Sequence, residues 1–225
     1  MNIDLHVHTT ASDGIETPER MVARAAAIGL DGIAITDHDT ISGWERAIDA
    51  GRRLGIFVIP GKEMRIRVGK KVVGEILALF LNEDIKLNQL SDIGEIIDLI
   101  RSQDGIVAIP HPFDWLRKSI LIEKLERKGI RVDAVEVLNA RNRRESITKS
   151  IEYAKRHGYP GIGGSDAHCA KELGSAYTFC NTDDIEEFRK MIKKGKAIPM
   201  GSPLPLFEVM ADRIFCRISR IFSSE

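Results

Sequence analysis

Hydrophobic residues along this chain follow two spacings in turn, which predicts short strands separated by longer amphipathic helices. A β-branched run over Ile3–Val7 predicts a strand, helical spacing over Pro18–Ile28 predicts a helix, and Gly32–Thr36 predicts the next strand. The further elements expected on the same grounds are a helix over Ser42–Leu54, strands over Ile56–Pro60 and Val72–Phe80, a helix over Leu87–Ser102, a strand over Gly105–Ile109, a helix over Ile120–Lys128, a strand over Val132–Leu138, a helix over Arg144–His157, strands over Gly161–Gly164 and Ala176–Cys180, and a helix over Asp184–Lys194. This order favours an α/β fold with parallel strands.

The chain reads as one barrel-like domain over residues 1–200 with a helical tail over 201–225. Its 225 residues suit a single α/β barrel, and neither a repeat nor a linker-like segment interrupts it before about Gly201. The tail carries an apolar stripe at helical spacing, formed by Leu206, Met210, Ile214, Ile218 and Ile221. We expect the stripe to dock against the barrel, with a dimer interface second and an anionic membrane surface third.

Charge and cysteine content limit which binding partners and which cellular compartment are expected. The 33 basic residues balance 33 acidic ones, so no overall field attracts long nucleic acid or a membrane, and we expect neither as a partner. The three cysteines, Cys169, Cys180 and Cys216, form no CxxC pair, which favours free thiols in a reducing compartment. Since no targeting segment or membrane span is recognisable, a cytoplasmic protein is expected. The sequence leaves open whether it is a monomer or a homo-oligomer.

Histidines and acidic residues cluster where the predicted strands end. His6 and His8 lie two apart on the first strand, which points both side chains to one face. The other clusters are Asp37 with His38, Glu63 after the third strand, His111 after Gly105–Ile109, Glu136 within Val132–Leu138, and Asp166 with His168 after Gly161–Gly164. The strands of a parallel barrel end at one face, and imidazole and carboxylate groups are shared ligands of divalent ions. The pattern therefore predicts a metal centre at the carboxyl ends of the strands.

Six segments together resemble the PHP family, named after its polymerase and histidinol phosphatase members. They are DLHVHTTASDG (residues 4–14), AITDHDT (34–40), PGKE (60–63), IPHP (109–112), VEVLN (135–139) and GGSDAH (163–168). The resemblance implies a distorted seven-stranded (β/α) barrel with two or three divalent metal ions, usually Mn, Zn or Fe, in a cleft at the strand ends.

Carried over residue by residue, the resemblance implies three metal positions. His6, His8, Glu63 and Asp166 would hold the first metal, Glu63 and His111 the second, and Asp13, His38 and His168 the third. Relatives commonly have a histidine at the position of Glu75, where this chain reads Glu75-Ile76-Leu77-Ala78. Glu75 can still coordinate through oxygen, and an anionic ligand favours a harder ion such as Mn²⁺ or Mg²⁺ there.

The chemistry such a centre supports is attack of a metal-bridging hydroxide on a phosphate ester. Asp166 and His168 are the candidates for proton transfer, and Glu63 is the bridging ligand. Basic residues beyond strand ends are candidates for substrate phosphate, namely Arg117, Lys118, Arg141, Arg143 and Arg144. For the run 141–144, a solvated helix start explains the charge equally well.

The predicted function is a metal-dependent phosphoesterase for small molecules or short nucleotides, of the nucleoside 3',5'-bisphosphate or 5'-end oligonucleotide type. Histidinol-phosphate phosphatase is the alternative within this class. A non-catalytic metal-stabilised module and a C–N hydrolase are alternatives from other classes. Glu136 is balanced between a site role and a polar contact to Asn139, whereas Asp4, Asp37 and Asp39 are expected to support turns or ligands. We assign His157 and Cys169 no role.

Overall fold

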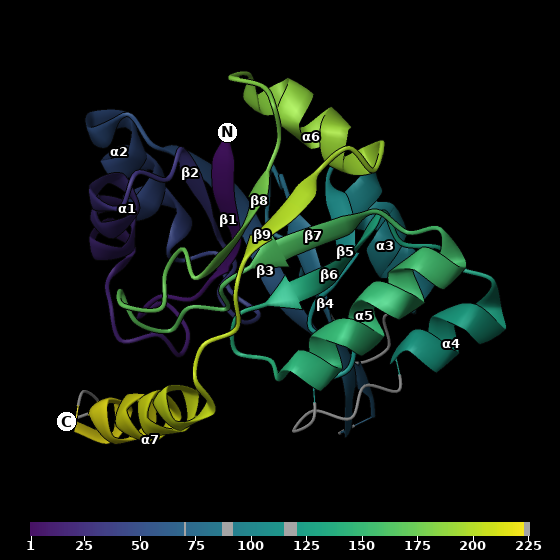
Figure 1. Ribbon diagram of the computed structural model, residues 1–225. Coiled ribbons are helices and arrows are strands. Elements are labelled where there is room, and N and C mark those ends of the chain that lie inside the picture. The colour runs from purple at the N-terminus through teal and green to yellow at the C-terminus, as the bar shows by residue number, and fades with distance from the viewer. Residues whose placement is uncertain (70, 87–91, 115–120, 223–225) are drawn as a thin grey trace.

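The computed structural model describes residues 1–69, 71–86, 92–114 and 121–222, in which a helix follows most of the strands (Figure 1). The strands are β1 (Asn2–Val7), β2 (Gly32–Ile35), β3 (Phe57–Val68), β4 (Lys71–Leu79), β5 (Ile106–Ile109), β6 (Ala134–Asn139), β7 (Gly161–Gly164), β8 (Ala176–Phe179) and β9 (Ile198–Gly201). The helices are α1 (Pro18–Ala27), α2 (Trp44–Leu54), α3 (Ile93–Ser102), α4 (Leu121–Lys128), α5 (Arg144–His157), α6 (Ile185–Lys193) and α7 (Leu206–Phe222). The helix expected over Leu87–Ser102 begins only at Ile93, behind an Asp92 capping box, and residues 87–91 lie outside the described residues.

One sheet contains all the described strands, in the order β7-β6-β5-β4-β3-β2-β1-β8-β9. Neighbouring strands among β1, β2 and β3, and among β5, β6 and β7, pair in parallel as predicted. The expectation of parallel strands is wrong for β4 and β8. Strand β4 is antiparallel to both β3 and β5, and β8 is antiparallel to β1. Since only two residues connect β3 to β4, a hairpin is the available geometry and a parallel crossover is not.

The sheet curls until its ends approach each other, which gives a nearly closed barrel. Thr178 of β8 donates its hydroxyl to the Gly163 carbonyl of β7 at 2.8 Å, and the Gly163 amide donates back at 2.9 Å. Beyond the strand ends, His8 N donates to Ala167 O at 2.9 Å. Figure 1 shows β7, β8 and β9 side by side. The predicted barrel type is therefore confirmed, with nine strands among the described residues in place of the seven expected. The unforeseen β9 pairs with β8 at the end of the sheet.

Two apolar layers hold the barrel together. The outer layer packs the helices on the sheet, as Val22 of α1 does against Ile33 of β2. The inner layer fills the barrel with inward-facing residues such as Ile3, Leu5 and Leu77, and α6 closes its amino-terminal end with the fully buried Phe188 and Ile192. Burying the inner layer stabilises the fold and leaves the carboxyl-terminal end of the barrel for polar side chains.

A bulge in β1 directs the first two histidines into the barrel. The pairing of β1 with β2 shifts register between Asp4 and Val7. Leu5 therefore belongs to the inner layer while Val7 belongs to the outer one, although strict alternation would place both on the same face. His6 and His8, on the face opposite Val7, consequently point into the barrel above Leu5.

Helix α7 contacts the body through a different face from the one predicted. Its buried residues are Val209, Asp212 and Cys216, whereas Leu206, Met210 and Ile214 of the predicted stripe are exposed. The side chains of Ile218 and Ile221 lie outside those described. Docking of the stripe is thus wrong for its described part, because α7 buries Val209, Asp212 and Cys216 against the body instead. No helix within the described ranges is long and apolar enough to cross a membrane.

Candidate metal centre

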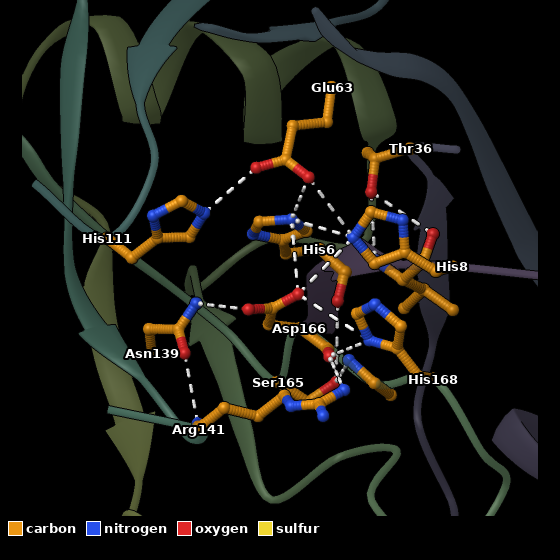
Figure 2. Close-up of polar contacts among 12 residues, drawn as sticks. His6, His8, Thr36, Glu63, His111, Asn139, Arg141, Ser165, Asp166 and His168 are labelled. Carbon is orange, nitrogen blue, oxygen red and sulfur yellow. Dashed lines mark hydrogen bonds and ion pairs between the residues drawn. The ribbon is translucent and has the colours of Figure 1, made fainter. Parts of the chain in front are cut away.

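Side chains from separate strands converge at the carboxyl-terminal end of the barrel (Figure 2). His6 belongs to β1 and His8 follows directly after it, and their Nε2 atoms lie 3.2 Å apart. Glu63 comes from β3, which continues to Val68, so this residue lies within a strand and not after it as predicted. His111 follows β5, and Asp166 and His168 follow β7. The structure therefore brings together residues that are up to 162 positions apart, as the strand-end pattern predicts.

Glu63 is the common neighbour of four imidazoles. Its Oε2 atom lies 3.4 Å from His6 Nε2, 3.3 Å from His8 Nε2 and 3.1 Å from His38 Nδ1. Its Oε1 atom lies 2.9 Å from His111 Nε2. Glu63 is fully buried, so these groups meet in a medium that strengthens their electrostatic interactions. One carboxylate contacting imidazoles on both oxygens has the geometry of a ligand shared between two positions.

Two further carboxylates complete the ring of acidic groups. Asp166 Oδ1 lies 3.3 Å from His8 Nε2 and 3.6 Å from His6 Nε2. Asp13, on the loop after β1, lies 3.3 Å from His168 Nε2, 3.6 Å from His38 Nε2 and 3.7 Å from His8 Nδ1. The cluster therefore extends from Glu63 through His8 to Asp13.

Glu75 reaches the same cluster from β4. Its Oε1 atom lies 3.9 Å from His38 Nδ1, and its Oε2 atom lies 3.6 Å from His111 Nε2. Glu75 is the central residue of β4 and pairs with Arg65, two residues beyond Glu63 in the antiparallel β3–β4 hairpin. The antiparallel strand thus adds an oxygen donor where we expected a metal-binding residue.

The donor atoms gather in groups that fit divalent ions. Among the described residues at this end, atoms within 4.8 Å of one another come from His6, His8 and Glu63; from His6, His111 and Asp166; from His38, Glu63 and Glu75; and from His8, Asp13, His38 and His168. Buried His8 Nδ1 has no hydrogen-bond partner among the described residues, which is costly unless another ligand binds it. Nitrogen and oxygen donors suit Mn²⁺, Fe²⁺ and Zn²⁺, so the residues present fit a divalent-metal site.

The acidic groups control the protonation of the histidines. Burial disfavours a charged His8, but hydrogen bonds with Asp166 and Glu63 outweigh it and raise the pKa of His8 to about 10. Burial and the neighbouring His8 instead lower the pKa of His168 to about 4. Burial opposes ionisation of Glu63, yet His6 and His38 hold its pKa well below the usual range. The carboxylates that hold these protons are therefore the groups that a bound cation would contact in place of the protons.

Glu136 orients His6 from behind. Its Oε1 atom lies 2.9 Å from His6 Nδ1, while its Oε2 atom accepts hydrogen bonds from the His111 amide at 2.7 Å and from Asn139 Nδ2 at 2.9 Å. This pairing leaves Nε2 of His6 directed at Glu63 and Asp166. Both readings left open by the sequence therefore apply, because Glu136 contacts Asn139 and also supports a candidate ligand.

Substitution of Glu136 by glutamine tests this orientation. We expect Glu136→Gln to fold normally and to bind divalent metal about 10- to 100-fold more weakly, because the neutral amide holds His6 in the required tautomer less firmly. Isothermal titration of metal-free protein with Mn²⁺ measures the effect. Unchanged affinity would show that Glu136 serves only the local polar network. Glu152→Gln, on α5, is the control.

Three aspartates support loops, as expected. Asp4 accepts hydrogen bonds from the amides of Ser165 and Gly174, both at 2.9 Å, and burial raises its pKa to about 6. Asp37 accepts from the amide and the hydroxyl of Thr9, both at 2.8 Å. Asp39 contacts Arg65. These residues fix the loops that carry the candidate ligands without joining the cluster.

Backbone conformation is unusual at two of the candidate ligands. His111 has φ of 28° and Asp166 has φ of 57°, in the left-handed region that residues with a Cβ rarely adopt. Gly164 lies two residues before Asp166, and a Cβ there would approach His6 Cβ to 2.6 Å. Such strain is retained where it orients functional side chains, and here it sits in the residues that face Glu63 and His8.

The predicted substrate-binding cations lie in different environments. Arg141 is buried and directs Nη1 at Asp166 O, 3.4 Å away, and at Glu172 Oε2, 3.5 Å away, so it supports the loop after β7. Arg143 and Arg144 are exposed at the start of α5. Arg117 and Lys118 lie outside the described residues. Sequence reasoning missed Arg65 of β3, which pairs opposite Glu75; strand alternation from Glu63 could have indicated it.

Models of known protein families match most of this chain. The model of the PHP domain matches residues 4–130, more than half of the chain, and the PHP-associated model matches residues 144–197. The chain belongs to the PHP family. The matched PHP domain contains His6 to His111, and the PHP-associated segment contains Asp166 and His168, so the site spans both.

Relatives with named activities match this PHP protein over different lengths. The 5'-3' exoribonuclease Rnm of Escherichia coli is 30% identical over 86% of this chain and 54% of its own length. The 3',5'-nucleoside bisphosphate phosphatase of Chromobacterium violaceum is 42% identical over 32% of this chain and 25% of its own length. The chain thus spans about half of the first relative and a quarter of the second.

A solved structure shares the fold. A two-domain protein from Bacteroides vulgatus, which contains a predicted PHP-like metal-dependent phosphoesterase, superposes with a TM-score of 0.73 at 20% identity. The match covers 90% of this chain and 65% of that chain. At this identity the likeness supports the barrel architecture and not a particular substrate.

Proposed function

We propose that this PHP protein is a divalent-metal-dependent phosphoesterase that acts on nucleoside 3',5'-bisphosphates or on the 5' ends of short oligonucleotides. The observation that carries the proposal is the convergence of imidazoles from His6, His8, His38 and His111 on the buried Glu63. The names of the bisphosphate phosphatase and exoribonuclease relatives support the choice of substrate class. Balanced charge argues against long nucleic acid.

Different sets of residues would hold the metal ions of this centre. We assign a first metal to His6, His8, Glu63 and Asp166, a second to Glu63, Glu75 and His111, and a third to Asp13, His38 and His168. Bound divalent ions would neutralise the ester and lower the pKa of an attacking water. Glu63 would hold two positions at a fixed separation, and Glu136 would keep His6 aimed at the first.

Proton transfer is assigned to Asp166 and His168. His168 Nδ1 lies 2.8 Å from the Asp166 carbonyl oxygen, which favours the tautomer that donates from Nδ1 and leaves the lone pair on Nε2. Because burial and His8 lower the pKa of His168 to about 4, the ring is neutral at pH 7, and Nε2 can accept a proton when no third metal is bound to it. Asp166 lies beside it, with Oδ1 3.8 Å from His168 Nδ1.

A substrate panel tests the proposal. Metal-free protein is loaded with Mn²⁺, Zn²⁺ or Fe²⁺, and release of phosphate or nucleotide is followed from a 3',5'-bisphosphate, a short 5'-phosphorylated oligonucleotide, histidinol phosphate and an amide substrate. We expect turnover of the first two only with metal, and none in His8→Ala. Preference for histidinol phosphate or the amide would replace the proposed substrate class, and inactivity on the whole panel despite metal binding would favour a non-catalytic module.

Arg65 is the candidate for contacting substrate phosphate. Its side chain is 39% exposed, lies opposite Glu75 in the β3–β4 hairpin and is held by Asp39 through a 2.5 Å contact. We expect Arg65→Met to raise KM for a bisphosphate about tenfold with little change in kcat, because it removes a charged hydrogen bond to substrate. Steady-state kinetics measure the change, with Arg52→Met on α2 as the control. Equal KM values for wild-type protein and Arg65→Met would exclude Arg65 from substrate binding.

A further inference from the structure

A second cluster of donor atoms lies between the loop after β7 and helix α7. Ligand-type atoms of Cys169, Glu172 and Asp212 lie within 4.8 Å of one another. The three residues are 5%, 1% and 6% exposed, so the cluster is almost sealed from solvent. In Figure 1, α7 is the yellow helix at the carboxyl-terminal end of the chain. Asp212 therefore joins α7 to the loop that also carries Asp166 and His168.

Each carboxylate of the cluster uses one oxygen for protein contacts. Glu172 Oε2 accepts hydrogen bonds from the amides of His168 at 2.7 Å and Cys169 at 3.3 Å. Asp212 Oδ1 lies 2.6 Å from Lys171 Nζ. The remaining oxygens, Glu172 Oε1 and Asp212 Oδ2, are buried and have no hydrogen-bond partner within the described part of the chain. Buried carboxylate oxygens without a partner destabilise a fold, so both atoms are available to a ligand.

We propose that Cys169, Glu172 and Asp212 form a metal site separate from the strand-end cluster. A thiolate with two carboxylates selects a borderline ion such as Zn²⁺ or Co²⁺ over Mg²⁺ or Ca²⁺, which take oxygen ligands. The strand-end cluster offers only histidine and carboxylate donors among the described residues, so sulfur distinguishes the two sites. The ion would fasten α7 to the loop of Asp166 and His168, which makes it a structural site.

The charges around the cluster are compatible with a cation. A thiolate and two carboxylates carry three negative charges, and Arg141 and Lys171 offset two of them. Lys171 is 59% exposed, so its pair with Asp212 is screened by solvent and can separate at little cost. Arg141 contacts Glu172 through Oε2, which leaves Oε1 accessible to the ion. The two unpartnered carboxylate oxygens could also be satisfied without a metal, by a proton shared between Glu172 and Asp212.

Cobalt titration of the full chain tests the proposal, because a cysteine-thiolate-to-cobalt charge-transfer band in the near ultraviolet reports sulfur coordination alone. We expect wild-type metal-free protein to develop the band once cobalt exceeds the strand-end positions, with a final amplitude that corresponds to one thiolate-bound cobalt per chain. Cys169→Ser should lose the band, and Asp212→Asn should require more than about 100-fold higher cobalt, because even residues that only support ligands change affinity about 10- to 100-fold.

Cys180→Ser is the matched control, since Cys180 is also buried but lies beside the amino terminus, at the other end of the barrel. It should keep the band. The proposal is overturned if wild-type protein shows no band in excess cobalt, a measurement that does not depend on the folding of any variant. It is also overturned if the band persists in Cys169→Ser. A wild-type chain with no band, in which Glu172 and Asp212 titrate as a pair, would identify the shared proton instead.

Discussion

Glu63→Gln lowers kcat/KM for phosphate ester hydrolysis by about 10³-fold or more in our account, an effect comparable to the loss expected of His8→Ala. The carboxylate contacts His6, His8 and His38 through Oε2 and His111 through Oε1. An amide is uncharged and has only one acceptor atom, so it cannot serve both positions. Single-turnover and steady-state hydrolysis of a nucleoside 3',5'-bisphosphate by metal-loaded protein measures the loss.

The control for this experiment is Glu123→Gln, an exposed carboxylate on α4 with a side chain 63% exposed. It should retain full activity and metal content. Metal content of Glu63→Gln, measured on the same sample, separates a failure to bind metal from a failure of the chemistry. Activity of Glu63→Gln within about tenfold of wild type would contradict the role assigned to the shared carboxylate.

Removal of divalent metal is the second large effect, and it acts on stability. We expect chelated protein to unfold about 5–10 °C below metal-loaded protein, because a ligand at 100 times its Kd adds about 2.7 kcal/mol and a chain of this length shifts about 2–4 °C per kcal/mol. The physical reason is that Glu63, Asp166, Asp13 and Glu75 bring several negative charges into one buried cluster, which a bound cation neutralises. Differential scanning calorimetry measures the shift.

Two variants locate the origin of the shift. Cys169→Ser removes the proposed sulfur ligand and should retain most of the difference between loaded and chelated protein. Glu63→Gln should reduce it, because the strand-end cluster then binds metal weakly. Equal unfolding temperatures for metal-loaded and chelated wild-type protein would contradict the expected stabilisation of the fold by metal binding.

The ends of the strands were predictable because local sequence determines them. The run Ile3–Val7 places His6 and His8 at a strand end, and Gly161–Gly164 does the same for Asp166 and His168. A parallel arrangement of such strands brings their carboxyl ends together whatever the loops do between them. The convergence of these residues followed from the pattern, and the structure places them together.

Other features depend on tertiary pairing that the pattern does not contain. The two-residue connection after β3 reverses β4, and that reversal places Glu75 and Arg65 opposite each other at the site. The pairing of Glu136 with His6 joins residues 130 positions apart, so no local signal distinguished it from a contact to Asn139. The docking face of α7 was misjudged because it consists of Val209, Asp212 and Cys216, a mixed set that the apolar spacing does not indicate.

The central claim is that the strand-end cluster binds divalent metal and uses it to hydrolyse phosphate esters. The most direct test titrates Mn²⁺ into metal-free wild-type protein and records bound metal and the hydrolysis rate of a nucleoside 3',5'-bisphosphate in the same samples. Our account predicts that the rate rises with metal occupancy and that Glu63→Gln stays inactive throughout. Full occupancy without turnover, or turnover at the same rate in chelated protein, would contradict it.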